Sequence, residues 1–260
     1  MTAASDGLVR ERRGQVLILR LDRPEARNAL TGEMMRGLGS SAVAAEKDPD
    51  IRAVILTGSG DRAFCSGMDL RAFAAGGAVG FDSEEDADGY RRLTTGELTV
   101  PVVGAANGTA VGGGLELLLG CDLIVASGDA KFGLPEVKRG LFPGGGGTTI
   151  GTRIPIGAAL EMTLTGDPIS AARGYELGLV NAVVAPDEVL DTALGYAERI
   201  AANAPLGLAA CKDLVRLSVS DPALAATRLK EWQSTVFSSA DAKEGAAAFV
   251  EKRAPVWQGR

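Results

Sequence analysis

Four apolar runs rich in β-branched residues constrain the fold of this 260-residue chain most strongly. They occupy residues 16–21, 53–58, 100–106 and 122–127. Runs of this length, bounded by turn residues, are typical of buried strands. Helical patterns lie between them at residues 113–120 and 31–46, where Thr31 is a candidate N-cap. Strands that alternate with helices predict an α/β fold.

The chain also contains a short internal repeat and a helical tail. Asp129 and Phe132 of LIVASGDAKF lie 68 residues after Asp61 and Phe64 of VILTGSGDRAF. A match this short also arises by chance, but a real repeat indicates stacked copies of a strand-rich turn. Helical periodicity replaces the strands late in the chain, which predicts a core at residues 1–195 and a helical region at residues 196–260. Within that region, the spacing of Asp241 and Glu244 resembles a capping box.

Composition limits the possible chemistry. The chain contains no histidine, which excludes Ser-His-Asp, Cys-His and H-E-x-x-H zinc sites. Acid–base chemistry must then use Asp, Glu, Lys, Tyr or Cys. The net charge of -6 argues against nucleic acid as a partner. Three widely spaced cysteines and the lack of a secretory signal favour a cytoplasmic protein. The most apolar region, residues 100–126, is interrupted by polar residues and predicts core, not a membrane span.

One glutamate, Glu116, follows three glycines and is surrounded by leucines in GGGLELLLGCD (112–122). Glycines before a helix allow another group to approach the backbone, and the first helical turn has N–H groups without intrahelical partners. A carbonyl oxygen that acquires negative charge would be stabilised there. Tight helix–strand packing is the structural alternative. Neither this stretch nor PGGGGTTIG (143–151) has the spacing of a nucleotide-binding motif.

A second glutamate, Glu136, lies in an apolar setting in FGLPEV (132–137). A carboxyl group that is removed from water has a raised pKa, which suits proton transfer near neutral pH. Each glutamate alone also fits a structural role, but two of them beside one helix start predict paired acid–base catalysis. Residues 74–89 are glycine-rich and then acidic, which predicts a solvated loop or, alternatively, a wall over a ligand.

Three motifs, FCSGMDL (64–70), NGTAVGGGLELLLGCD (107–122) and KFGLPEVKRGLFPGGGG (131–147), closely resemble the enoyl-CoA hydratase/isomerase, or crotonase, superfamily. DRPEARNAL (22–30) matches as well, so the resemblance covers essentially the whole chain. It implies a crotonase-like spiral of repeated ββα units followed by a C-terminal helical region. It also implies homotrimers, or hexamers made of two trimers, with the C-terminal helices at the subunit contacts.

The resemblance also implies an acyl-CoA thioester substrate and no metal or cofactor beyond the coenzyme A of that substrate. The backbone N–H groups of Met68 and Gly113 would form an oxyanion hole for the thioester oxygen. Glu116 would activate water for attack at Cβ, and Glu136 would exchange the proton at Cα. The residues expected to line the substrate site are Met68, Asp69, Leu70, Arg71, Gly113, Ala26 and Arg27.

These features predict an enoyl-CoA hydratase of fatty acid metabolism. Such a lyase adds water reversibly across the 2,3 double bond of a 2-enoyl-CoA thioester. An enoyl-CoA isomerase, which typically needs only the carboxylate at Glu136, is one alternative. A carnitinyl-CoA-like dehydratase and a non-catalytic or RNA-binding relative are the others. Residues 149–152 read Thr-Ile-Gly-Thr where many hydratases have Gln-Arg-Leu-Pro, so the sequence does not predict the acyl pocket.

Overall fold

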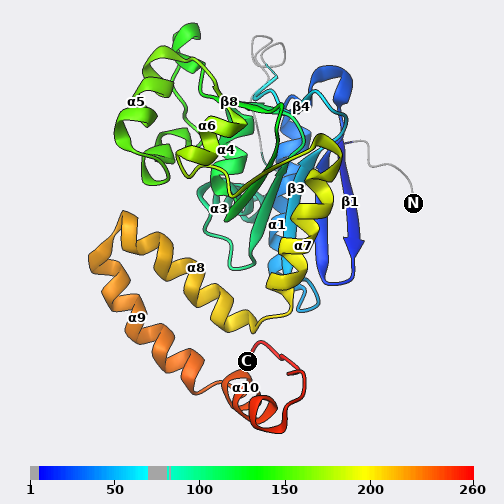
Figure 1. The fold of residues 1–260 in the computed structure, drawn as a ribbon, viewed down its shortest axis with the longest axis vertical. Coiled ribbons are helices and arrows are strands. Elements are labelled where there is room, and N and C mark those ends of the chain that lie inside the picture. The colour runs from blue at the N-terminus through cyan, green and yellow to red at the C-terminus, as the bar shows by residue number, and fades with distance from the viewer. Residues whose placement is uncertain (1–5, 70–80, 82) are drawn as a thin grey trace.

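The chain forms two β-sheets, and helices pack around them (Figure 1). The chain passes from the larger sheet to the smaller one three times. The computed structural model describes residues 6–69, 81 and 83–260. The larger sheet has the order β1 (Leu8–Arg13), β2 (Val16–Leu21), β3 (Ala53–Gly58), β5 (Val102–Ala106), β7 (Leu123–Ser127) and β10 (Ala182–Val184). The smaller sheet has the order β4 (Ala63–Cys65), β6 (Thr109–Val111), β8 (Lys131–Gly133) and β9 (Ile169–Ser170). Both sheets are mainly parallel, so the predicted α/β class is confirmed.

A strand–turn–strand unit occurs three times, as β3–β4, β5–β6 and β7–β8. Each unit gives its first strand to the larger sheet and its second strand to the smaller sheet. Phe64 and Phe132 occupy the middle of β4 and β8 and are both fully buried, so the sequence repeat corresponds to the first and third units. The internal repeat in the sequence does not include the second unit, because the turn of that unit is Asn107-Gly108 and not the Gly-Asp of the other two.

The predicted helices are present with small shifts at their ends. α1 (Gly32–Lys47) is capped by Thr31, whose hydroxyl accepts a hydrogen bond from the N–H of Met34 at 3.2 Å. α4 (Gly113–Gly120) has the predicted bounds. The acidic end of segment 74–89 is a helix and not a loop, because Ser83 caps α3 (Glu84–Thr95) and the acidic first turn complements the helix dipole. Residues 74–80 and 82 of that segment lie outside the described part of the chain.

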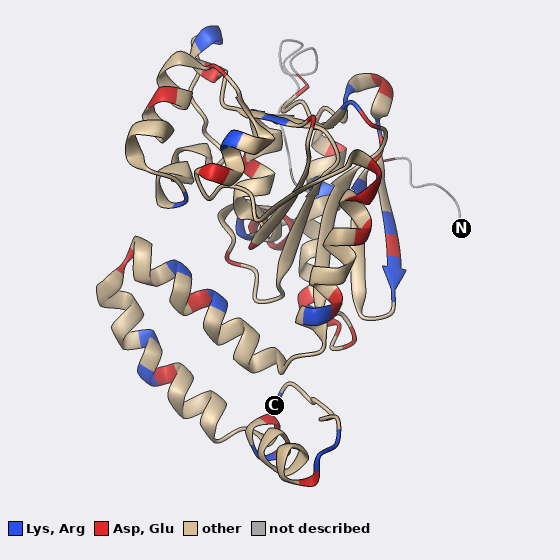
Figure 2. Cartoon of the chain, viewed as in Figure 1, with Lys and Arg blue, Asp and Glu red and all other residues tan. Residues whose placement is uncertain are grey.

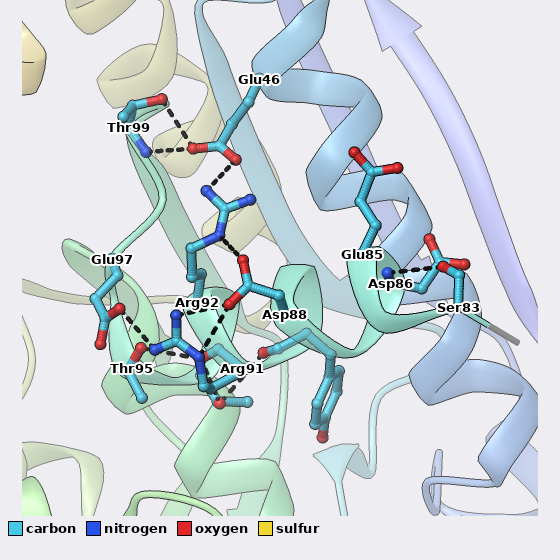
Figure 3. A network of polar contacts seen from close by, with 12 residues as sticks. Glu46, Ser83, Glu85, Asp86, Asp88, Arg91, Arg92, Thr95, Glu97 and Thr99 are labelled. Carbon is cyan, nitrogen blue, oxygen red and sulfur yellow. Dashed lines mark hydrogen bonds and ion pairs between the residues drawn. The ribbon is translucent and has the colours of Figure 1, made fainter. Parts of the chain in front are cut away.

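A network of charged side chains holds α3 against α1 (Figure 3). Arg92 of α3 forms ion pairs with Asp88 on its own helix and with Glu46 of α1. The other carboxylate oxygen of Glu46 accepts a hydrogen bond from the N–H of Thr99 at 2.7 Å. The same α3 also packs along α4, where the absence of a side chain at Gly120 allows close contact with the carbonyl of Leu93. α3 therefore connects α1 with α4.

Every residue of α4 from Gly114 to Gly120 is buried, in the main core between the sheets and the helices around them. A second core lies on the other face of the larger sheet, which α7 (Val189–Ala201) covers. The remaining α-helices among the described residues are α5 (Ile156–Thr165), α6 (Ala171–Glu176), α8 (Pro205–Ser220), α9 (Pro222–Phe237) and α10 (Ala240–Glu251). The last three extend away from the sheets (Figure 1).

The structure of the tail bears on two expectations from the sequence. The predicted boundary between residues 195 and 196 falls inside α7, which packs on the sheet as far as Ala201. The capping box at Asp241 is wrong: Ser239 caps α10 and accepts from the N–H of Ala242 at 3.0 Å. The Asp241 carboxylate instead accepts hydrogen bonds from the N–H groups of Gln258 and Gly259. Among the described residues, no helix is both long and apolar enough to cross a bilayer.

Candidate active site

Two backbone N–H groups meet where the loop after β4 lies against the start of α4. Leu30 donates to the carbonyl of Gly67 at 2.8 Å, and the N–H of Asp69 donates to the carbonyl of Leu30 at 3.0 Å. Because Leu30 bonds to the residues on both sides of Met68, the N–H of Met68 points away from Leu30. A Cβ added at Gly113 would lie 3.7 Å from the nitrogen of Met68. Neither of these N–H groups has a hydrogen-bond acceptor within the described residues.

The start of α4 also has no side-chain cap. Gly112 occupies the N-cap position with φ 56° and ψ -131°, a conformation that L residues disfavour, and no side chain accepts from the first helical N–H groups. The N–H of Gly112 itself donates to the carbonyl of Gly133 in β8 at 3.0 Å. The free N–H groups at the positive end of the helix dipole can therefore receive an anionic oxygen.

Glu116 lies one turn into α4 and is 8% exposed. Its Oε1 accepts hydrogen bonds from the N–H groups of Gly145 at 2.8 Å and Gly147 at 3.0 Å. A Cβ on Gly145 would lie 2.6 Å from Oε2, so any larger residue here would displace the carboxylate. The two amides hold the carboxylate in one orientation and leave Oε2 without a hydrogen-bond donor from the described residues. The PGGGG stretch therefore orients Glu116.

Glu136 begins the short 3₁₀ helix η2 (Glu136–Arg139) directly after Pro135. A Cβ on Gly112 would lie 3.2 Å from Oε1 of Glu136, so this carboxyl group lies beside the start of α4. Its Oε2 is buried and has no hydrogen-bond partner among the described residues. Burial raises the pKa of Glu136, and the negative charge of Glu116 raises it further. The protonated acid is therefore favoured more than in water.

The other predicted lining residues lie next to this centre or outside the described residues. The N–H of Ser66 donates to the carbonyl of Arg27 at 3.1 Å, which places Ala26 and Arg27 beside the loop that carries Met68. The carboxylate of Asp69 pairs with Arg23 at 3.3 Å. Leu70 and Arg71 lie outside the described residues. The structure thus brings Met68, Gly113, Glu116 and Glu136 together.

Sequence reasoning missed a buried asparagine that supports this region. Asn28 has a left-handed backbone, with φ 55°, and is fully buried. Its side-chain amide donates to the carbonyls of Ser59 at 2.9 Å and Ala63 at 2.8 Å, and its Oδ1 accepts from the N–H of Arg23. The signal was available, because Asn tolerates positive φ better than most residues. Asn28 therefore fixes the loop that carries Arg27 against β4.

A buried thiol near the two amides is not a candidate for acid–base chemistry. Cys65 ends β4, and burial raises the pKa of its thiol to about 12. The thiol is therefore neutral near neutral pH, and a thiol without thiolate character is inert. Two carboxyl groups remain, beside two N–H groups that have no acceptor in the described part of the chain. This arrangement can transfer protons next to a carbonyl group whose oxygen gains negative charge.

The contact between Gly145 and Glu116 predicts an effect on stability. Gly145→Ala places a Cβ against Oε2 and separates Oε1 from its backbone donors. We expect the free energy of unfolding to fall by about 1–3 kcal/mol, the cost of an unsatisfied buried polar group. Gly144→Ala is the matched control, because its nearest neighbours would be 3.9 Å from the new Cβ. Urea denaturation of both variants measures the difference, and equal stabilities would contradict this role for Gly145.

The raised pKa of Glu136 predicts a pH dependence of stability. Its folded-state pKa lies above the ordinary value of 4.5, so its protonated form is favoured in the folded state. Its contribution to the free energy of unfolding is fully present below the unfolded-state pKa and is lost as pH rises through the folded-state pKa. Glu136→Gln removes this loss, so the variant should gain stability relative to wild type as pH rises from about 4 to about 8. Urea titrations across this range test it, and a pH-independent difference would be evidence against it.

Sequence comparisons with known proteins match the chain over nearly its whole length. The sequence model of the enoyl-CoA hydratase/isomerase family matches residues 11–260. The chain is 42% identical over 261 residues to enoyl-CoA hydratase EchA19 of Mycobacterium tuberculosis, with 98% of this chain and 97% of the relative covered. It is 40% identical over 255 residues to carnitinyl-CoA dehydratase of Proteus mirabilis, with 95% of this chain and 97% of the relative covered.

A solved structure gives the same result. The crystal structure of an enoyl-CoA hydratase from Mycobacterium tuberculosis superimposes with a TM-score of 0.89 at 41% identity, covering 98% of this chain and 100% of that chain. This likeness confirms the spiral fold expected from the sequence motifs. The chain belongs to the enoyl-CoA hydratase/isomerase family.

Proposed function

We propose that this protein is an enoyl-CoA hydratase, which adds water reversibly across the 2,3 double bond of a 2-enoyl-CoA thioester. The observation that carries the proposal is the placement of two carboxyl groups, Glu116 and Glu136, beside two unpaired N–H groups at the start of α4. The names of the relatives at 40–42% identity support the same reaction class.

The two N–H groups receive the thioester oxygen. When hydroxide from water attacks Cβ, electron density moves through Cα to the thioester carbonyl, and its oxygen becomes enolate-like. The N–H groups of Met68 and Gly113 then donate to an oxygen that carries more charge than in the ground state. Removal of one such donor typically costs about 10²–10³ in rate, so the pair supplies a large part of the stabilisation.

The two carboxyl groups divide the proton transfers. Glu116 accepts a proton from the attacking water through Oε2, because Oε1 is occupied by the amides of Gly145 and Gly147. Glu136 donates a proton to Cα, which agrees with the burial that raises its pKa. In the reverse direction Glu136 removes the Cα proton, and Glu116 protonates the departing hydroxyl group. Atoms and charges balance without a redox or metal cofactor, and the coenzyme A belongs to the substrate.

The isomerase and RNA-binding alternatives explain fewer features. An isomerase typically needs only the carboxylate at Glu136. In this structure two backbone amides also orient the carboxylate of Glu116, which an isomerase would not require. A carnitinyl-CoA-like dehydratase runs the same chemistry backwards, and a relative of that name is 40% identical. An RNA-binding role is opposed by the net charge of -6 and by acidic and basic side chains that are interspersed along the helices (Figure 2).

Exchange of each carboxyl group tests the two-carboxylate mechanism. Glu116→Gln and Glu136→Gln should each lower kcat for crotonyl-CoA hydration by about 10²-fold or more, because each removes a proton-transfer group. Loss of the conjugated enoyl absorbance measures the rate. Glu161→Gln, an exposed glutamate on α5, is the control and should retain wild-type activity. Full hydratase activity in Glu116→Gln would refute the mechanism, and surviving isomerase activity in that variant would favour the isomerase.

We propose further that residues 1–195 form the catalytic core and that residues 196–260 form an oligomerisation region. α9 has no buried residue, and α8 buries only Ala210. Large apolar side chains are exposed on these helices: Val215, Val219, Leu224, Leu229 and Phe237. Helices depend mainly on packing of an apolar face for stability, so these faces need a partner surface. A homotrimer, or two trimers in a hexamer, supplies it.

The assembly has a direct test. Multi-angle light scattering at micromolar concentration should report a trimer or hexamer. Leu229→Glu, which places a charge on the apolar surface of α9, should shift the protein to smaller species. A stable, active monomer of the wild-type protein would contradict the proposed oligomerisation region. We also propose a reducing, cytoplasmic location. The free thiols of all three cysteines support it, because disulfides are rare in reducing compartments.

A further inference from the structure

Three cationic side chains gather at the end of α4 that lies opposite the unpaired N–H groups. Lys212 and Arg216 of α8 both pair with Asp122, at 2.8 and 2.9 Å. The Lys212 side chain is only 8% exposed. Arg153, between η3 (Gly147–Thr152) and α5, lies close enough to Arg216 and Asp122 to interact electrostatically with both. The carboxylate of Asp122 therefore interacts with three cations.

The two arginines bond to the last carbonyls of α4. Nη2 of Arg216 donates to the carbonyls of Gly120 at 3.1 Å and Cys121 at 3.2 Å. Arg153 donates to the same carbonyl of Cys121. The last carbonyls of a helix have no intrahelical donors, and the negative end of the helix dipole favours cations. The C-terminal end of the helix that carries Glu116 is thus held by side chains from two other segments.

One of those segments also holds Glu116 itself. The backbone amides of Gly145 and Gly147 bond to Oε1 of Glu116, and the same segment reaches Arg153 six residues after Gly147. Segment 145–153 therefore contacts α4 at two places, the Glu116 carboxylate and the Cys121 carbonyl. A displacement of Arg153 relative to α4 would be transmitted to the two amides that orient the carboxylate.

The charge pattern argues against a purely stabilising role. Two guanidinium groups at one carbonyl repel each other, and burial together with Arg216 lowers the pKa of Arg153. Leaving such cations incompletely compensated inside a protein costs stability. The two arginines do provide directional hydrogen bonds to the carbonyl of Cys121. A simple apolar contact would not fix the position of this carbonyl in the same way.

We infer that Arg153 and Arg216 are positioning residues for Glu116, so that α8 fixes the geometry of the catalytic helix through the Cys121 carbonyl. The inference rests on the proposed hydratase function. It also connects the C-terminal region with catalysis, because Val215 and Val219 on the same helix are exposed and available to a second copy of the chain.

The test is a double-mutant cycle with Glu116. Arg216→Met should lower kcat for crotonyl-CoA hydration by about 10²-fold, the loss that a misplacement of about 1 Å can cause, and change KM by less than about 3-fold. In the Glu116→Gln background the same change should lower the remaining kcat by less than about 2-fold, because the group that it positions is absent. Equal losses in both backgrounds would show a merely structural role and overturn the inference.

Two further variants keep the test decisive. Arg216→Lys keeps the ion pair with Asp122 and should recover most of the kcat that Arg216→Met loses. This variant tests the inference even if the methionine variant folds poorly. Loss of kcat in the lysine variant equal to that in the methionine variant would count against the inference. Arg173→Met is the control, because it removes an exposed arginine whose ion pair within the described residues is with Glu176. Its kcat should equal that of wild type.

A structural readout separates this inference from the proposed function. Crystal structures of wild type and Arg216→Met should show the distance between the Gly147 nitrogen and Oε1 of Glu116 lengthening from 3.0 Å to beyond hydrogen-bond range. An unchanged distance would refute the inference whatever the activity. A wild-type enzyme that hydrates no 2-enoyl-CoA would refute the proposed function alone, because this distance is measured without turnover.

Discussion

The close packing of α4 against the strand–loop connection after β4 is the contact on which the candidate site depends. Gly114 has no side chain, so the helix lies directly against the carbonyl of Cys65. Any Cβ at this position would separate the helix from the loop. The contact brings the N–H groups of Met68 and Gly113 into the same space and points the positive end of the helix dipole toward it. The core leucines of α4 then fix the helix between the sheets and α3.

Environment, and not residue type, distinguishes the two carboxyl groups. Oε1 of Glu116 has two amide donors, whereas Oε2 of Glu136 is buried without a donor from the described residues. Two chemically identical side chains thereby become a fixed acceptor and a group that favours its proton. A chain without histidine needs this division, because no other side chain here titrates near neutral pH without a perturbed pKa. Different surroundings for two carboxyl groups are a general way to obtain an acid and a base.

Local patterns predicted β2, β3, β5, β7, α1 and α4, and they singled out the two glutamates, because periodicity, caps and glycine placement depend on neighbouring residues. Contacts between distant segments were not predictable in this way. The amides that orient Glu116 come from Gly145 and Gly147, about thirty residues later. The wrong capping box has the same cause: amides near the C-terminus occupy the Asp241 carboxylate, and Ser239 takes its place at the cap. The separate roles expected of Glu116 and Glu136 came from the family resemblance, because their spacing alone does not assign them.

The backbone of Gly112 limits how this site can change over evolutionary time. Its φ of 56° and ψ of -131° disfavour every side chain, and a Cβ here would lie 3.2 Å from Oε1 of Glu136, a tight contact that would press on this carboxyl group. A codon change at this position therefore affects the helix start and the second carboxyl group at once, and no graded series of small substitutions connects glycine to another residue. We therefore expect changes in substrate preference to come from other positions, where a side chain can vary without moving the helix start or Glu136.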